Sequence, residues 1–166
     1  EATVVIAPYD TITLAFLQEW EGQGLGMRVQ TAIQSEPKGT GHAVQCALES
    51  DPVPSGVMWV LANGDNLPTR SALSRLRTEG AGLAVLAYDR NALGLDPAKT
   101  MAFAVLEGDG TTVHRITEKP DSSVVERLAA SGSVRVSMNY FRLDGEHLQT
   151  HLAALAPHPE RGELEL

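Results

Sequence analysis

The sequence predicts an α/β protein in three layers, with helices on both faces of a mixed, mostly parallel sheet. Along the chain, the spacing of apolar residues switches repeatedly between the spacing typical of a strand and that typical of a helix. Residues 57–63 and 83–89 are almost uninterrupted apolar runs, which are typical of strands covered on both faces. A chain of 166 residues with 43% hydrophobic content can bury one core, so we expect a single domain over residues 1–166.

The first half of the chain alternates strands and helices. Residues 3–7 form a β-branched run that is typical of a buried strand, and Ile12, Phe16 and Trp20 follow at the spacing of one helix face. The expected strands and helices up to residue 89 are 3–7, 12–20, 27–33, 42–50, 57–63, 71–77 and 83–89. This strand–helix order is the one that predicts parallel strands joined by helical crossovers.

The second half has a different pattern. Residues 101–120 read as a β-hairpin that turns at Asp109 and Gly110. Residues 133–143 predict one more strand, and a last helix follows it. The antiparallel hairpin is what makes the predicted sheet a mixed one.

Composition excludes several classes of protein. The formal net charge of -8, without clusters of Lys and Arg, argues against a nucleic-acid partner. No apolar run reaches membrane length and no signal-peptide pattern opens the chain, so we expect a soluble protein with no membrane partner. The single cysteine, Cys46, suits a reducing compartment, and the predicted location is the cytoplasm.

The loop 34–41 carries the first candidate site. Gln34 ends its predicted strand with an amide that can both donate and accept, as recognition of a nucleobase edge requires. Gly39 and Gly41 have no side chains, so a base or a phosphate could approach the backbone and the following helix. The alternative is a simple turn in which Thr40 is the N-cap of the helix.

The loop after residues 57–63 carries the second candidate. Asp65 lies just past a strand that is too apolar to hold an unpaired carboxylate. It offers one hard oxygen ligand where a magnesium ion that bridges phosphates would need it. The alternative is a turn aspartate that follows Gly64.

Five segments occur together in a known order. They are Q-S-E-P-K-G-T-G-H-A-V, V-L-A-N-G-D, I-T-E-K-P-D, V-S-M-N-Y-F and E-R-G-E-L-E-L. Over nearly its whole length the chain resembles the sugar-1-phosphate nucleotidyltransferases, and most of all the uridylyltransferases that make UDP-N-acetylglucosamine. The resemblance implies a Rossmann-like, three-layer nucleotidyltransferase (GT-A-like) fold. It also implies an enzyme that joins a nucleoside triphosphate, UTP, to N-acetylglucosamine 1-phosphate or a similar hexose 1-phosphate and releases pyrophosphate. Such nucleotide sugars supply the cell envelope.

The resemblance assigns three roles to residues that match the family's motifs. The nucleotide-binding residues are Gln34, Gly39, Thr40 and Gly64; the catalytic Mg²⁺ ligand is Asp65; and the sugar-phosphate contacts are Glu118, Lys119 and Asn139. An ungapped match puts Ser137 in the place of Asn139. The attacking group in this chemistry is the sugar phosphate itself, so no protein nucleophile is needed.

Parts of the family's pattern are missing. The sequence holds no Gly-rich loop of the form G-x-G-T-R, which grips the triphosphate, and no downstream residue that shares the metal. We therefore expect an internal fragment, truncated at both ends, that alone releases no pyrophosphate. Two alternatives stay open: a noncatalytic regulatory or assembly subunit, and a glycosyltransferase that uses a nucleotide sugar. The latter class usually shows Asp-x-Asp, which the Gly-Asp-Asn at 64–66, followed by Leu67, does not supply. The oligomeric state, a homo-oligomer included, is left open.

Overall fold

The computed structural model describes residues 1–166 except residues 25, 53, 55, 81 and 160. The chain forms two compact units. Unit 1 comprises Glu1–Val57 and Gly145–Leu166, and unit 2 is the continuous segment Met58–Asp144. Two compact units can belong to one domain, so the single domain stays a prediction.

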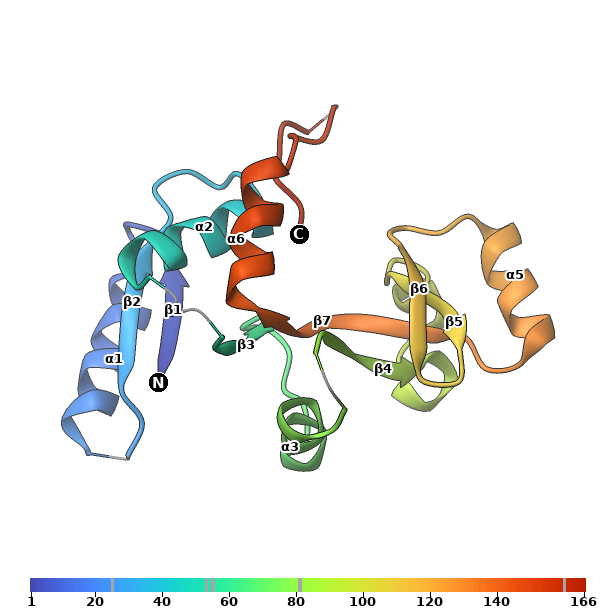
Figure 1. Cartoon of the computed structure of the whole chain (residues 1–166), viewed down its shortest axis with the longest axis horizontal. Coiled ribbons are helices and arrows are strands. Elements are labelled where there is room, and N and C mark those ends of the chain that lie inside the picture. The colour runs from blue at the N-terminus through green and yellow to red at the C-terminus, as the bar shows by residue number, and fades with distance from the viewer. Residues whose placement is uncertain (25, 53, 55, 81, 160) are drawn as a thin grey trace. The chain divides into compact units, whose positions relative to one another are not determined.

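Unit 1 is built on a pair of parallel strands, β1 (Ala2–Ile6) and β2 (Val29–Ile33), which lie side by side in Figure 1. The connection between them is α1 (Thr11–Gly22), and α2 (Thr40–Ser50) follows β2. The last helix, α6 (Gly145–Ala154), belongs to the same unit. The buried apolar side chains of unit 1 include Ile6, Val29, Ala32, Ala47, Leu48, Leu148 and Leu152.

Unit 2 is organised around the long strand β7 (Arg135–Asp144). One of its edges pairs with β4 (Ala84–Asp89). The other edge pairs first with β5 (Val105–Asp109) and then, nearer its end, with β3 (Met58–Ala62). Every one of these pairings is antiparallel, so β3 and β4 run in the same direction with β7 between them. Phe141 and Arg142 of β7 pair with both β3 and β4, which fixes those two strands on opposite edges.

The hairpin and the remaining helices complete unit 2. Strand β6 (Thr112–Thr117) pairs antiparallel with β5. The predicted hairpin is confirmed, but its turn lies one residue later than predicted: Asp109 pairs with Thr112, and Gly110, at φ 51°, begins the turn. The helical segments of unit 2 are α3 (Arg70–Thr78), η1 (Arg90–Leu93), α4 (Pro97–Thr100) and α5 (Ser122–Ser131).

The mixed α/β fold predicted from the sequence is confirmed, with a smaller parallel share than expected. Among the described strands, β1 and β2 form the parallel pair and the other four pairings are antiparallel. The reason is the position of β7, which separates β3 and β4 and so replaces a parallel neighbour with two antiparallel ones. Along the described residues, no helix is long and apolar enough to cross a membrane.

Two features hold unit 2 together. Val105 and Val136 are fully buried in a cluster with Val125 and Val134, which joins β5 and β7 to α5. Arg142, which is also buried, donates from Nε to the Gly82 carbonyl (2.9 Å) and from a terminal nitrogen to the Gly80 carbonyl (3.2 Å). These hydrogen bonds tie β7 to the turn before β4, because a buried guanidinium needs acceptors in place of water.

Candidate functional site

The side chain of Gln34 holds in shape the loop 34–41, which we call the base loop because it is the predicted nucleobase site. Its amide nitrogen donates to the Gly39 carbonyl (3.0 Å) and lies 3.2 Å from Nδ1 of His42. The same ring nitrogen lies 3.2 Å from the Glu36 carbonyl. The amide oxygen of Gln34 has no hydrogen bond to any described residue, so this side chain can still accept a hydrogen bond from a ligand.

The bare backbone at Gly39 and Gly41 accommodates a segment of the chain itself. A Cβ atom added to Gly39 would lie 2.5 Å from the carbonyl oxygen of Leu164. The Gly41 amide donates to that carbonyl (2.7 Å), and the Leu164 amide donates to the Lys38 carbonyl (2.7 Å). The backbone of Gly39, at φ 93° and ψ 177°, is in a region that only glycine readily adopts. Close packing of the segment around Leu164 therefore requires this glycine, whatever else the loop binds.

Thr40 does not cap the helix. The N-cap residue of α2 is Gly39, which offers no side chain, so the interpretation of Thr40 as the N-cap is wrong. Its hydroxyl instead accepts a hydrogen bond from the amide of Leu166 (3.2 Å). Because a hydroxyl both accepts and donates, Thr40 retains a proton that it can donate to a ligand.

The charges of the base loop neutralise one another. The Lys38 ammonium lies 2.8 Å from the Glu36 carboxylate, and both side chains are exposed. The hydrogen bond and charge of Lys38 hold the pKa of Glu36 below its ordinary value. The loop therefore presents little net charge next to Gln34, as suits a site for an uncharged base.

Asp65 lies on the loop that follows β3. It is exposed and forms no ion pair or side-chain hydrogen bond within the described part of the chain. No group of three or more His, Cys, Asp or Glu side chains that could hold a metal occurs among the described residues. One free carboxylate nevertheless fits Mg²⁺, which usually keeps several waters and takes one or two carboxylates together with substrate phosphates. The neighbouring Gly64 has open space around it, so packing does not require a glycine there.

Two predicted sugar-phosphate residues have unusual backbone conformations. Among the described residues other than glycine, only Lys119 (φ 45°) and Asn139 (φ 58°) have positive φ. Non-glycine residues in this region are uncommon and are enriched at functional sites. Glu118 and Lys119 follow β6 directly and are exposed. Asn139 is half-buried, whereas the hydroxyl of the buried Ser137 accepts a hydrogen bond from the Asn139 amide (3.1 Å), which favours Asn139 as the residue available to a ligand.

One hydrogen bond connects two of the loops that carry predicted site residues. Asn66, next to Asp65, donates from its side chain to the carbonyl of Met138, next to Asn139 (3.2 Å). The loop of Asp65 is thus attached to the segment that carries Asn139. Gln34, Gly39 and Thr40 belong to unit 1, whereas Gly64, Asp65, Glu118, Lys119 and Asn139 belong to unit 2.

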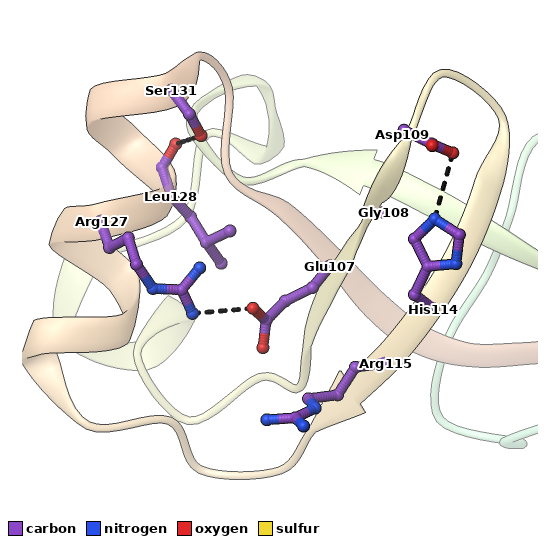
Figure 2. A pocket seen from close by; sticks show the side chains of 8 residues that line it. All are labelled: Glu107, Gly108, Asp109, His114, Arg115, Arg127, Leu128 and Ser131. Atoms are coloured by element: carbon purple, nitrogen blue, oxygen red, sulfur yellow. Dashed lines mark hydrogen bonds and ion pairs between the residues drawn. The ribbon is translucent and has the colours of Figure 1, made fainter.

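A groove of about 510 Å³ lies between the β5–β6 hairpin and α5, and Figure 2 shows its lining. Arg127 forms an ion pair with Glu107 (2.7 Å), and His114 lies 3.2 Å from Asp109. The hydrogen bond from Arg127 holds the pKa of Glu107 below its ordinary value. The groove contains none of the predicted site residues, and its carboxylates already have partners, so it is not the candidate site.

Three residues near the predicted sites were not predicted from the sequence. Leu164 covers the glycines of the base loop, and Asn66 and Tyr140 connect the Asp65 loop to β7. Their contacts depend on segments far apart in the chain. No local pattern in the sequence indicates them.

Comparison with known proteins identifies a fold that this chain shares with solved structures. No protein-family model and no curated protein sequence matches the chain. A protein assigned as a glucose-1-phosphate thymidylyltransferase from Bacillus anthracis, solved in complex with sucrose, superposes with a TM-score of 0.65 at 18% identity, over 98% of this chain and 59% of that one. HddC from Yersinia pseudotuberculosis superposes with a TM-score of 0.57 at 16% identity, over 89% of this chain and 57% of HddC. The chain thus spans less than three fifths of the length of each structure. At these identities the likeness establishes the architecture, and the chain has the mixed α/β fold of the thymidylyltransferase structure.

Proposed function

We propose that this chain belongs to an enzyme that transfers a nucleotidyl group from a nucleoside triphosphate to a sugar 1-phosphate and releases pyrophosphate. The observation that carries the proposal is the likeness of nearly the whole chain to the structure of a glucose-1-phosphate thymidylyltransferase. The five sequence segments that resemble the nucleotidyltransferases support it independently, because they depend on the identity of side chains and not on the path of the backbone.

The base loop of unit 1 recognises the nucleobase in this proposal. Gln34 uses its amide nitrogen on Gly39 and keeps its amide oxygen for a ligand, so a base that donates a hydrogen bond fits best. Uracil and thymine each have a ring N–H donor between two carbonyls. Both bases therefore fit the loop, and the resemblance of the sequence to the uridylyltransferases supports UTP as the nucleotide, with Thr40 as a second polar contact.

Asp65 holds Mg²⁺ in this proposal. The ion would neutralise phosphate charge and orient the triphosphate for in-line displacement. An exposed carboxylate without a competing cation is suited to this task, since it need not break an existing ion pair to bind the metal.

The sugar 1-phosphate binds through Glu118, Lys119 and Asn139 in this proposal. Glu118 and Asn139 are suited to hydrogen-bond sugar hydroxyls, and the Lys119 ammonium to approach the phosphate. A phosphate oxygen of the sugar 1-phosphate attacks the α-phosphorus of the triphosphate, and the bond from that phosphorus to the bridging oxygen of the leaving pyrophosphate breaks. We propose N-acetylglucosamine 1-phosphate as the sugar phosphate.

The test is a pyrophosphate-release assay on the product of the complete reading frame that encodes this chain. Four nucleoside triphosphates are tried with several hexose 1-phosphates. We expect the highest turnover with UTP and N-acetylglucosamine 1-phosphate. Absence of metal-dependent turnover with every pair, in a protein that is folded by circular dichroism, would rule out the proposed reaction.

Two variants test the assigned roles. Asp65→Ala should lower turnover at least about a hundredfold, the scale for losing a transition-state electrostatic contact, without changing the melting temperature.

Gln34→Ala should weaken binding of the preferred triphosphate by about 1 to 3 kcal/mol and reduce selection between bases, while sugar preference stays the same. A change of sugar preference with intact base preference would show that the base loop is misplaced.

A further inference from the structure

Asn66 and Tyr140 form a two-way bridge between the Asp65 loop and β7. The side-chain amide of Asn66 donates to the Met138 carbonyl (3.2 Å). In return, the Tyr140 hydroxyl donates to the backbone carbonyl of Asn66 (2.5 Å). All the atoms of the bridge belong to unit 2. Two hydrogen bonds in opposite directions restrain the loop more than either bond alone.

The bridge fills a break in the sheet. On one edge of β7, β3 ends opposite Tyr140 and β5 begins opposite Val136. On the other edge, the register of β4 shifts between its pairs with Phe141 and Ser137. Met138 and Asn139 therefore have no strand partner among the described pairings. The side chain of Asn66 supplies the hydrogen bond that a neighbouring strand would otherwise give to Met138.

Asn139 lies at this break in the strand pairing. Its backbone is left-handed, and its amide donates to the hydroxyl of Ser137, which is 3% exposed. On the C-terminal side of Asn139, burial holds Tyr140 in place, since this residue is only 2% exposed. The backbone of Asn139 is thus fixed on both sides, by Ser137 before it and by the Tyr140–Asn66 hydrogen bond after it.

Asp65 lies close to Tyr140. Burial raises the pKa of the Tyr140 phenol, and Tyr88 and the carboxylate of Asp65 add to the effect.

We propose that Asn66 and Tyr140 are positioning residues that fix the separation between Asp65 and Asn139. The proposal rests on the proposed function, in which Asp65 holds Mg²⁺ and Asn139 contacts the sugar phosphate. In-line transfer depends on the relative placement of its two reactants, so a loosened bridge should slow the chemical step more than it weakens either substrate.

Tyr140→Phe is the main variant, because it removes the hydroxyl and keeps the buried ring. Tyr88→Phe is the matched control: it makes the same deletion on the neighbouring strand β4, where the Tyr88 hydroxyl has no hydrogen bond to a described residue. In Tyr140→Phe we expect kcat to fall about tenfold, the equivalent of one lost hydrogen bond, while KM for each substrate changes less than about threefold. Tyr88→Phe should change neither. A fall of kcat equal to that in Tyr88→Phe, or a large rise in KM alone, would overturn the proposal.

A double-mutant cycle separates positioning from general destabilisation. Asn66→Ala and Tyr140→Phe break the same bridge, so the double variant should lose little more kcat than the worse single variant. Purely additive losses would contradict a shared role. Melting temperatures of all four proteins show whether folding is retained.

Hydrogen exchange tests the bridge without catalysis. In Tyr140→Phe the amides of Asn66 and Asn139 should exchange at least about tenfold faster, and the Ser137 amide, bonded to the Ala104 carbonyl (2.9 Å), should not change. Unchanged exchange at Asn66 and Asn139 would overturn the bridge whatever the activity. Faster exchange in a protein that forms no nucleotide sugar would support the bridge and refute the proposed function.

Discussion

Replacement of Gly39 by alanine tests what the glycine loop is for. The added Cβ would lie 2.5 Å from the Leu164 carbonyl oxygen, a distance at which backbone must move. The strained backbone conformation costs about 1 to 3 kcal/mol for a non-glycine residue. Displacement of Leu164 also weakens the hydrogen bonds of the Gly41 and Leu164 amides, at about 0.5 to 1.5 kcal/mol each. We expect unit 1 to lose about 2 to 6 kcal/mol of unfolding free energy, the sum of these contributions.

The assay is urea denaturation followed by tryptophan fluorescence in a Trp59→Phe background. The chain has two tryptophans, so Trp20 then reports on unit 1 alone. Gly24→Ala is the matched control, because Gly24 also has positive φ, at 64°, but has no atom within 4 Å of the added Cβ. It should cost about 1 to 2 kcal/mol. If Gly39→Ala is no more destabilising than Gly24→Ala, and the Gly41 amide stays equally protected from exchange, packing of Leu164 is not the reason for the glycine.

Three further predictions concern unit 2. Arg142→Met should lower the free energy of unfolding by about 1 to 3 kcal/mol, because it removes two hydrogen bonds. Arg77→Met, at an exposed position, is the control and should change this free energy by less than about 0.5 kcal/mol. Equal effects of the two variants in urea denaturation would contradict the prediction. Arg127→Met should raise the pKa of Glu107 toward its ordinary value in an NMR titration, and an unchanged pKa would show that the ion pair is absent in solution. Burial raises the pKa of the Tyr140 phenol above 10.0, so the unfolded chain loses the phenol proton at a lower pH than the folded chain, and the free energy of unfolding should fall as pH rises above about 10. Tyr140→Phe should make this fall of stability with pH less steep. An equally steep fall in the variant would count against burial of Tyr140 as the cause.

Local patterns in the sequence predicted the strands and helices well. The apolar run at 57–63 and the alternating segment at 133–143 correspond to β3 and β7, and the 42–50 helix to α2. These elements follow from residue spacing, which depends only on neighbours in the chain. The position of β7 between β3 and β4 depends on contacts between distant segments, so no local period indicates it.

Burial was harder to predict than secondary structure. Ile12 and Phe16 recur at helical spacing, and α1 forms over them, yet they are 84% and 57% exposed. Spacing predicts that one face of a helix is apolar but not what packs against it. The same limit applies to the site: the Gly-Thr-Gly motif identifies backbone without bulky side chains, whereas the contact of this backbone with Leu164 depends on a segment far away in sequence.

Unit 1 is discontinuous in the chain, and this has a consequence for its synthesis. Unit 2 is a single stretch, Met58–Asp144, so a ribosome delivers all of it before residue 145. The base loop, in contrast, is made early but waits for the amide and carbonyl of Leu164, which are translated only after the whole of unit 2. During that interval the Lys38 carbonyl and the Gly41 amide lack the partners that Leu164 gives them. The segment around Leu164 therefore completes the base loop, and a chain stopped before it should leave the base loop incomplete while unit 2 folds at its usual rate.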